Sequence, residues 1–149
     1  MSVLFFNLFI MRSLNRMMLI GHLAADPDVR TTESGISVAT FPVATNRDWR
    51  TDDGKKKEAV DYHKIVAWRK LADVCAQYLV KGTPVYVDGR LQNSSYEDKD
   101  GKKKFSTEIV LDKLNVLVYK NKKGNVEVNV KDVSVEPEEA EAEAKAVAA

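Results

Sequence analysis

Apolar and polar residues alternate along much of the chain, with the two-residue period of a β-strand that buries one face. Residues 17–23 (MMLIGHL) form a short apolar run, and the Asp26-Pro27 pair ends it. Alternation resumes over residues 36–49 (ISVATFPVATNRDW), where Pro42 favours an edge strand or a β-bulge over a central strand. Two strands are therefore expected in the first third of the chain.

A hairpin is predicted next, because residues 51–59 (TDDGKKKEA) contain an Asp53-Gly54 pair that suits the positive φ angles of a tight turn. The turn carries three consecutive lysines. The strand that follows ends in DYHKIVAW, and alternation places four of its side chains on one face: Tyr62, Lys64, Val66 and Trp68. His63, Ile65 and Ala67 belong to the other face. One face of this strand thus combines aromatic rings with positive charge.

The period then changes to that of a helix. Residues 69–79 carry an apolar stripe with helical spacing, formed by Leu71, Val74, Cys75, Tyr78 and Leu79. Gly82 lies where a C-terminal cap belongs. A second hairpin is expected beyond it, with Asp100-Gly101 at its turn and three more lysines at 102–104. The acidic, low-complexity residues 132–149 are predicted to be a disordered tail.

Five strands with one short helix between the third and the fourth is the element order of an OB-fold. This all-β fold is a five-stranded Greek-key barrel whose sheet face and hairpin loops bind oligonucleotides. We expect three regions: an apolar N-terminal extension at 1–13, an OB-fold domain at 14–131, and the acidic tail at 132–149. A chain of 149 residues is long enough for one such core.

Charge divides the chain in two. The net charge is +1, but residues 136–149 hold five Glu and one Lys, a balance of −4, which leaves +5 for residues 1–135. The single cysteine excludes an intramolecular disulfide and suits a reducing compartment. The body is therefore basic, and nucleic acid is a reasonable partner for it.

The first residues, MSVLFFNLFIMRSLNR, are apolar but too few to cross a bilayer, which takes about 20 residues, so no membrane partner is expected. They also lack the basic start and small-residue cleavage site of a secretory signal. The preferred interpretation is an added or mis-assigned start ahead of Met11. The alternative is an organelle-targeting segment, because residues 1–16 hold two Arg and no acidic residue.

Four segments carry a resemblance to a known family: NRMMLIGHLAADPDVR, SVATFPVATNRDWR, DYHKIVAWRKLADVCAQYLVKGTPVYVDGRL and YEDKDGKKKFSTEIV. In this order and spacing they resemble the bacterial-type single-stranded DNA-binding proteins, over about residues 14–119. The resemblance implies a homotetramer that coats single-stranded DNA during replication, recombination and repair. It also implies a place in the cytoplasm, at the nucleoid, and subunits that pair through residues 17–23.

The resemblance also assigns site residues. Base stacking would fall to four rings: Trp49, Tyr62, Trp68 and Tyr96. The candidates for phosphate contact are twelve basic residues: Arg16, Arg30, Lys55, Lys56, Lys57, Lys64, Arg69, Lys70, Lys81, Lys102, Lys103 and Lys104. Each also has a plainer interpretation, since rings in strands usually pack in cores and lysines in turns are usually solvated.

Two departures from the family pattern change the expectation. Basic residues usually follow the fourth strand's Gly-x-Leu, whereas this chain has Gln92, Asn93, Ser94 and Ser95. The family's acidic tail commonly closes on Pro and an aromatic residue that recruits replication and repair proteins. This sequence ends in KAVAA, so weak or absent binding to such partners is predicted.

Other functions find less support. His22, His63 and Cys75 lack metal-ligand spacing, and Cys75 belongs to the apolar stripe of the helix, so we expect no metal or cofactor. His63 is expected to be a hydrogen-bonded histidine in the core or at a subunit contact. No nucleophile or phosphate-loop motif indicates an enzyme. The alternatives are an OB-fold for RNA or for loading another protein, and an enzyme subunit that only positions a nucleic acid.

Overall fold

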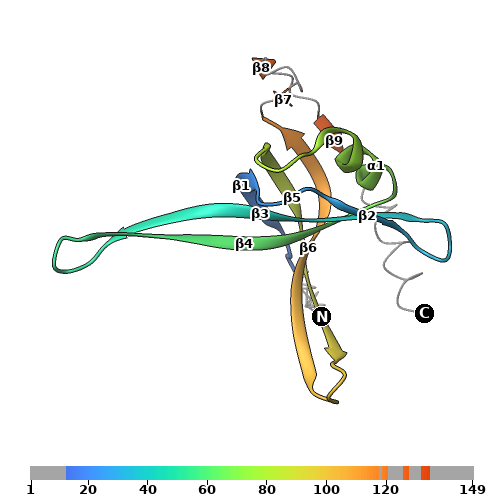
Figure 1. Ribbon diagram of the computed structural model, residues 1–149, viewed down its shortest axis with the longest axis horizontal. Coiled ribbons are helices and arrows are strands. Elements are labelled where there is room, and N and C mark those ends of the chain that lie inside the picture. Colours follow the sequence, from blue (N-terminus) through green and yellow to red (C-terminus); the bar gives the residue numbers. More distant parts are fainter. Residues whose placement is uncertain (1–12, 118, 121–125, 128–131, 135–149) are drawn as a thin grey trace, which may run out of the picture.

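The computed structural model describes residues 13–117, 119–120, 126–127 and 132–134 (Figure 1). Six main strands and one helix make up the fold: β1 (Met17–Leu23), β2 (Asp28–Thr31), β3 (Ser37–Arg50), β4 (Lys56–Trp68), α1 (Arg69–Tyr78), β5 (Pro84–Glu97) and β6 (Lys103–Val116). Three short strands follow: β7 (Tyr119–Lys120), β8 (Val126–Glu127) and β9 (Asp132–Ser134). The helix predicted at residues 69–79 is confirmed within one residue at its C-terminal end. The strands that flank it end at Trp68 and begin at Pro84.

Five of these strands close into a barrel in the order β1, β5, β6, β4, β3, and β3 returns to β1. The closing contact is short, with His22 opposite Ala44 and Leu23 opposite Val43. β4 and β6 run parallel, with Ile65 opposite Ile109, and the other pairs in the barrel are antiparallel. This connectivity, with α1 between the third and fourth barrel strands, confirms the predicted OB-fold.

The core lies inside the barrel and under the helix. Alternate residues of each barrel strand are buried, led by Phe41, Leu23, Ile65, Leu114, Val43, Val85 and Val87. α1 packs on β3 and β4 and buries its predicted stripe at the end of the barrel, through Leu71, Cys75 and the following Leu79. Burial of these side chains holds the sheet faces in place and so decides which side chains point outward.

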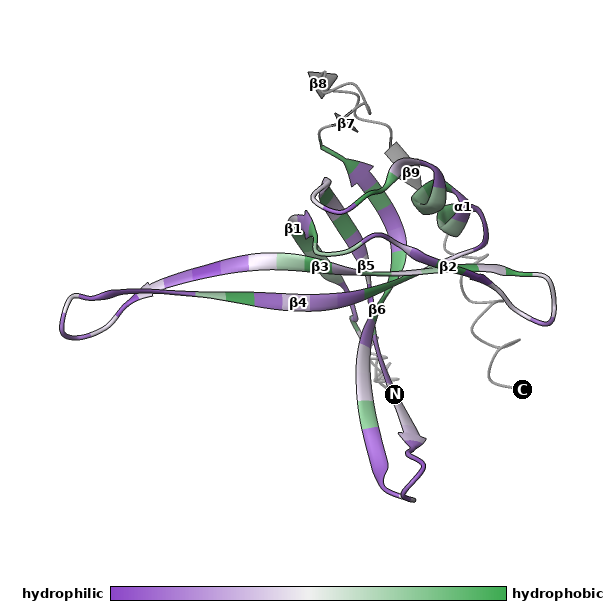
Figure 2. Cartoon of the chain, in the orientation of Figure 1, coloured by the Kyte–Doolittle hydropathy of each residue, from purple (hydrophilic) through white to green (hydrophobic). Residues whose placement is uncertain are grey.

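Two hairpins extend well beyond the barrel as arms. We call β3–β4, which pairs as far as Arg50 and Lys56, the first arm. We call β5–β6, which pairs as far as Glu97 and Lys103, the second arm. Figure 1 shows them leaving the barrel in different directions, and Figure 2 shows that hydrophobic residues gather at the barrel while the arms are largely hydrophilic.

The turn at each arm tip uses the predicted Asp-Gly pair. Gly54 and Gly101 both have φ of 75°, a conformation that costs a residue with a Cβ about 1–2 kcal/mol. In the first arm the Gly54 N–H donates to the Thr51 carbonyl at 2.8 Å, and the Thr51 N–H donates to the Lys55 carbonyl at 3.0 Å. Each loop therefore has three residues, with glycine at the position of positive φ.

Pro42 lies in an interior strand, so the prediction of an edge strand or a bulge there is wrong. The register between β3 and β4 runs without interruption past Pro42, which faces Lys64. The other side of β3 pairs with β2 up to Thr40 and with β1 from Val43. Pro42 lies in the gap between these two ladders and has no strand partner on that side among the described residues. Its carbonyl accepts the Ala24 N–H at 2.9 Å, and no strand there requires the N–H that proline lacks.

Four short strands lie outside the five that were predicted: β2, β7, β8 and β9. β2 follows directly after the Asp26-Pro27 break, and its four residues are all exposed, so it has no burial pattern for a sequence to show. β9 pairs with β6, opposite Lys113, Leu114 and Asn115, which places the first three residues of the predicted tail in a strand. Residues 1–12 of the N-terminal extension and 135–149 of the tail lie outside the described residues.

Candidate nucleic-acid interface

The outward side of β4 carries the rings and charge that alternation predicted. Ile65 and Ala67 are completely buried in the core. On the opposite face, Tyr62 is 67% exposed, Lys64 is exposed and Trp68 is half-buried, whereas Val66, which was predicted for the same face, is buried. The core residues thus direct the Tyr62 side of the strand to the surface.

This surface continues across the barrel to the second arm. The Lys64 ammonium on β4 forms an ion pair with the Glu108 carboxylate on the neighbouring β6. Glu108 faces Gln92 on β5, and alternation along β5 brings Tyr96 to the same side, 55% exposed and opposite Lys104. We call this surface the outer face, and its rings are Tyr62, Trp68 and Tyr96.

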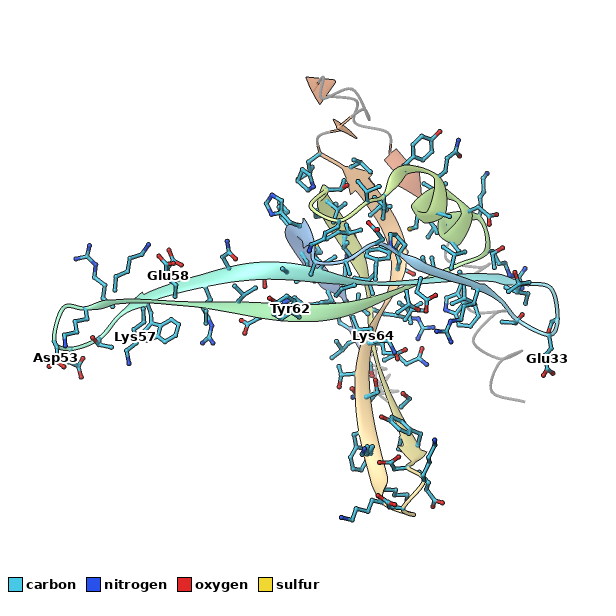
Figure 3. The ribbon with its side chains drawn as sticks, in the orientation of Figure 1. Glu33, Asp53, Lys57, Glu58, Tyr62 and Lys64 are labelled. Carbon is cyan, nitrogen blue, oxygen red and sulfur yellow. The ribbon has the colours of Figure 1, made fainter. Side chains whose placement is uncertain are left out.

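Trp49 lies on the other side of the first arm. Tyr62 pairs with Ala44 on β3 and therefore shares its face. Ala44 and Trp49 are an odd number of residues apart on the same strand, so Trp49 and Tyr62 lie on opposite faces. Figure 3 shows the same alternation at adjacent residues, with Lys57 and Glu58 pointing to opposite sides of the hairpin. We call the side that continues from the barrel interior the core-side face. The structure therefore does not bring the four predicted rings onto one surface.

An arginine covers one side of the Trp49 ring. The Arg47 guanidinium carbon lies 5.0 Å from the ring centroid, a distance at which a cation is attracted to the π-face. Arg47 Nε is in turn 3.3 Å from an Asp61 carboxylate oxygen on the facing strand. Trp49, 40% exposed, thus lies beside a positive charge that was not among the predicted phosphate contacts.

The twelve predicted phosphate contacts are spread over the molecule, and several already have acidic partners. Lys56 lies 3.1 Å from Asp48 and 2.6 Å from Glu58, and Arg30 lies 2.7 Å from Asp28. Lys64 and Lys104 pair with Glu108 and Asp98. Such exposed pairs contribute about 0–1 kcal/mol each, so a phosphate can displace the carboxylate.

Their pKa shifts agree with these pairings. The hydrogen bonds that the Lys56 ammonium donates to Glu58 and, second in size, to Asp48 raise the pKa of Lys56. The Asp98 carboxylate accepts a hydrogen bond from the Lys104 ammonium and, second in size, one from the Lys99 N–H, and both lower the pKa of Asp98. Arg16 differs from the others because its partner, Asp88, is a buried carboxylate that the guanidinium neutralises.

Four of the predicted lysines at the arm tips have no acidic partner in the part of the chain that the structure describes: Lys55, Lys57, Lys102 and Lys103. They occupy the ends of two arms that point in different directions (Figure 1). Arg69 and Lys70 begin α1, and Lys81 follows it. The basic residues therefore form two separate tips and scattered positions, not one patch.

The second arm carries one exposed ring that sequence analysis missed and the neutral stretch that it expected. Phe105 on β6 is 80% exposed and was not among the predicted stacking rings. Its position directly after three lysines could have indicated that it lies on the surface. The neutral residues 92–95 of β5 are all exposed, so this stretch of the arm offers hydroxyl and amide groups where basic residues were noted as missing.

Cys75 is a packed thiol and His63 a hydrogen-bonded histidine, as the sequence predicted. Cys75 is completely buried, and burial raises the pKa of its thiol to about 12. A hydrogen bond of 2.9 Å joins His63 Nε2 to Thr45 Oγ1 on the facing strand. Among the described residues no group of three His, Cys, Asp or Glu could hold a metal ion. The same residues include no helix long and apolar enough to cross a membrane.

Comparisons with known proteins agree with this geometry. Residues 14–117 match the model of the single-strand binding protein family. The chain is 49% identical over 114 residues to single-stranded DNA-binding protein 1 of Chlorobaculum tepidum, covering 76% of this chain and 70% of the relative. It is 40% identical over 119 residues to single-stranded DNA-binding protein 1 of Xylella fastidiosa, covering 77% and 88%.

A solved structure is also similar. It is described as a Plasmodium falciparum SSB complex with ssDNA, and it superposes with a TM-score of 0.64 at 38% identity. The match covers 67% of this chain and 88% of that one.

Proposed function

The chain belongs to the single-strand binding protein family, and we propose that it binds and coats single-stranded DNA without sequence preference. The observation that supports this most directly is the outer face, where exposed rings lie beside basic side chains across three strands of an OB-fold. Rings that served only to fill a core would be buried, as Phe41 is.

Stacking supplies the affinity that does not depend on sequence. Every base has a π-face, and stacking on an aromatic side chain contributes about 1–3 kcal/mol per base. We assign this role to Tyr62, Trp68 and Tyr96 on the outer face, and to Trp49 on the core-side face of the first arm. The rings present no paired donors and acceptors with which to distinguish one base from another.

Phosphate contact supplies the remaining affinity and makes binding sensitive to salt. We assign it first to the arm-tip lysines at 55–57 and 102–104, and then to the scattered residues: Arg16, Arg30, Lys64, Arg69, Lys70 and Lys81. For single strands, the logarithm of the binding constant should fall with that of the salt concentration, with a slope of about −0.7 per neutralised phosphate.

The protein holds DNA open during replication, recombination and repair, and carries out no catalytic step. It acts in the cytoplasm, at the nucleoid, with residues 14–131 as the DNA-binding domain. It assembles as a homotetramer, and β1 offers the contact. In the described residues, positions 17–21 of β1 pair only with β5, which leaves the other edge of the strand open. Met18 and Ile20 on this strand are 59% and 66% exposed.

Intrinsic tryptophan fluorescence tests the proposal. The protein is titrated with oligo-dT, with the same length of oligo-U, and with a duplex, each at low and high salt. Deep quenching by oligo-dT, with little by duplex and weaker binding at high salt, is expected. An equal response to duplex would refute single-strand binding, and a clear preference for oligo-U would favour an RNA ligand instead.

A further inference from the structure

Phe105 is the most exposed aromatic side chain of the described residues, at 80%, compared with 55% for Tyr96 on the same arm. A phenylalanine ring has no polar atom for water to solvate, so its exposure is unfavourable by about 25 cal/mol for each Å² left in water. The residue opposite it is Ser95, and its neighbours along the same face are Lys103 and Thr107. No apolar side chain on this face is placed to cover the ring.

The ring lies on the core-side face of the second arm. Phe105 pairs with Ser95 and Tyr96 pairs with Lys104, so alternation places the two rings on opposite sides of the hairpin. Ile109 belongs to the same face as Phe105 and is buried in the barrel. The second arm therefore presents one ring on each side.

A cation lies beside this ring. Lys103 is two residues away on the same face, about 7 Å along the strand. No carboxylate pairs with it among the described residues, although Glu97 faces it across the ladder. A ring and an unpaired ammonium at this spacing match a base and a phosphate of an extended single strand.

The first arm repeats this arrangement. Its core-side face carries Trp49 with Arg47 two residues away, and the guanidinium lies over the ring. Each arm thus has an exposed tyrosine on the outer face, Tyr62 or Tyr96, and a ring next to a cation on the core-side face.

We propose that Phe105 stacks a base on the side of the second arm away from Tyr96, and that Lys103 holds the adjoining phosphate. This rests on the proposed function, single-strand binding. The bound strand then contacts both sides of the arm instead of running along the outer face alone.

A reporter at position 105 provides the test. Trp49→Phe and Trp68→Phe remove the natural fluorophores but keep the rings, and Phe105→Trp adds a single one. Binding is measured independently by the anisotropy of a labelled oligo-dT. Quenching of Trp fluorescence in step with the anisotropy is expected. Unchanged fluorescence in a protein that binds would overturn the inference and leave the proposed function standing, whereas no binding by the natural protein would refute the function itself.

Side-chain removal gives a second measurement in the natural background. Phe105→Ala should weaken oligo-dT binding about five-fold or more, the effect of losing one stacked base. Ser95→Ala, directly opposite on the same face, is the matched control and should bind normally. Glu97→Gln removes the carboxylate facing Lys103 and should strengthen binding.

Sedimentation without DNA distinguishes base stacking by Phe105 from contact of the ring with a second copy of the chain. Phe105→Ala should keep the mass of the natural protein. A smaller species, with unchanged DNA affinity per subunit, would show that the ring serves an interface between copies and would overturn the inference.

Discussion

At the scale of single residues, the environment of each side chain decides what its chemistry can do. Tyr62 and Cys75 both belong to regular elements with clear periodic patterns, yet one is 67% exposed and the other completely buried. Exposure makes a ring available to a base, and burial makes a thiol unreactive.

Tyr62→Ala should weaken oligo-dT binding by about 1–3 kcal/mol, the contribution of one stacked base. The side chain is exposed, so the unfolding midpoint should change little. Tyr62→Phe keeps the ring and should retain most of the affinity. Titration by anisotropy measures both variants, and an equal loss in both would show that the hydroxyl group, not the ring, makes the contact.

The raised pKa of Cys75 should make stability depend on pH. Because burial moves this pKa from near 9 to about 12, the unfolded protein loses the thiol proton at lower pH than the folded protein does. Stability is therefore complete below pH 9 and falls above it, by up to about 1.4 kcal/mol per pH unit.

Urea unfolding at pH 8, 9, 10 and 11, compared with Cys75→Ala, isolates this effect because the other groups titrate alike in both proteins. The difference in unfolding free energy should decrease from pH 9 upwards. A constant difference would contradict the burial of the thiol, as would rapid modification of the native protein by a thiol reagent.

At the scale of elements, neighbouring strands lie so close together at Gly21 and Gly89 that neither position has room for a Cβ atom. A Cβ at Gly89 of β5 would lie 2.1 Å from the Val110 carbonyl oxygen on β6, which is backbone and cannot turn away. Gly89 also borders the register shift between the two strands. The glycine therefore allows the second arm to bend out of the barrel.

Gly89→Ala should cost on the order of 3 kcal/mol, because two strands must separate to admit the methyl group. Gly54→Ala is the control. It meets nothing within 4 Å and should cost about 1 kcal/mol, the penalty of positive φ. Denaturant unfolding measures both, and equal losses would argue against close contact at Gly89.

The lysines at the tip of the second arm should contribute through their charge. Lys102→Gln with Lys103→Gln is expected to make the salt slope of oligo-dT binding shallower by about 0.7 for each phosphate that the lysines no longer neutralise. Lys113→Gln, on the barrel part of β6, removes a charge far from the tip and should leave the slope unchanged. An unchanged slope in the double variant would exclude these lysines from phosphate contact.

At the scale of the whole molecule, the barrel positions two arms and one open strand edge. The two arms leave the barrel in different directions (Figure 1). One DNA strand can therefore contact both Tyr62 and Tyr96 only if it bends across the outer face. The proposed assembly edge belongs to β1, whereas the rings lie on β3 to β6, so we expect assembly and DNA binding to use different strands.

Ile20→Lys should break the proposed homotetramer into smaller species, since it places a charge on the open edge of β1. Sedimentation velocity measures the mass. Val29→Lys, at another exposed apolar residue on β2, is the control and should keep the natural mass. A tetramer that survives Ile20→Lys would place the interface on another surface.

The amino-acid sequence by itself determined the local structure of this protein. The two-residue period over residues 61–68, the helical stripe from Leu71 to Leu79 and the two Asp-Gly pairs each specify a structure formed by neighbours in the chain. They were sufficient for the strands, the helix, the turns and the outward position of Tyr62.

Tertiary structure alone decided how these elements combine, because pairing between strands depends on residues far apart in the chain. Only the register shows that Trp49 and Tyr62 lie on opposite faces, and only barrel closure gives Pro42 an interior place that needs no N–H. The exposure of Phe105 depends likewise on the polar strand that faces it, since local sequence sets the period of a strand but not the neighbours that cover it.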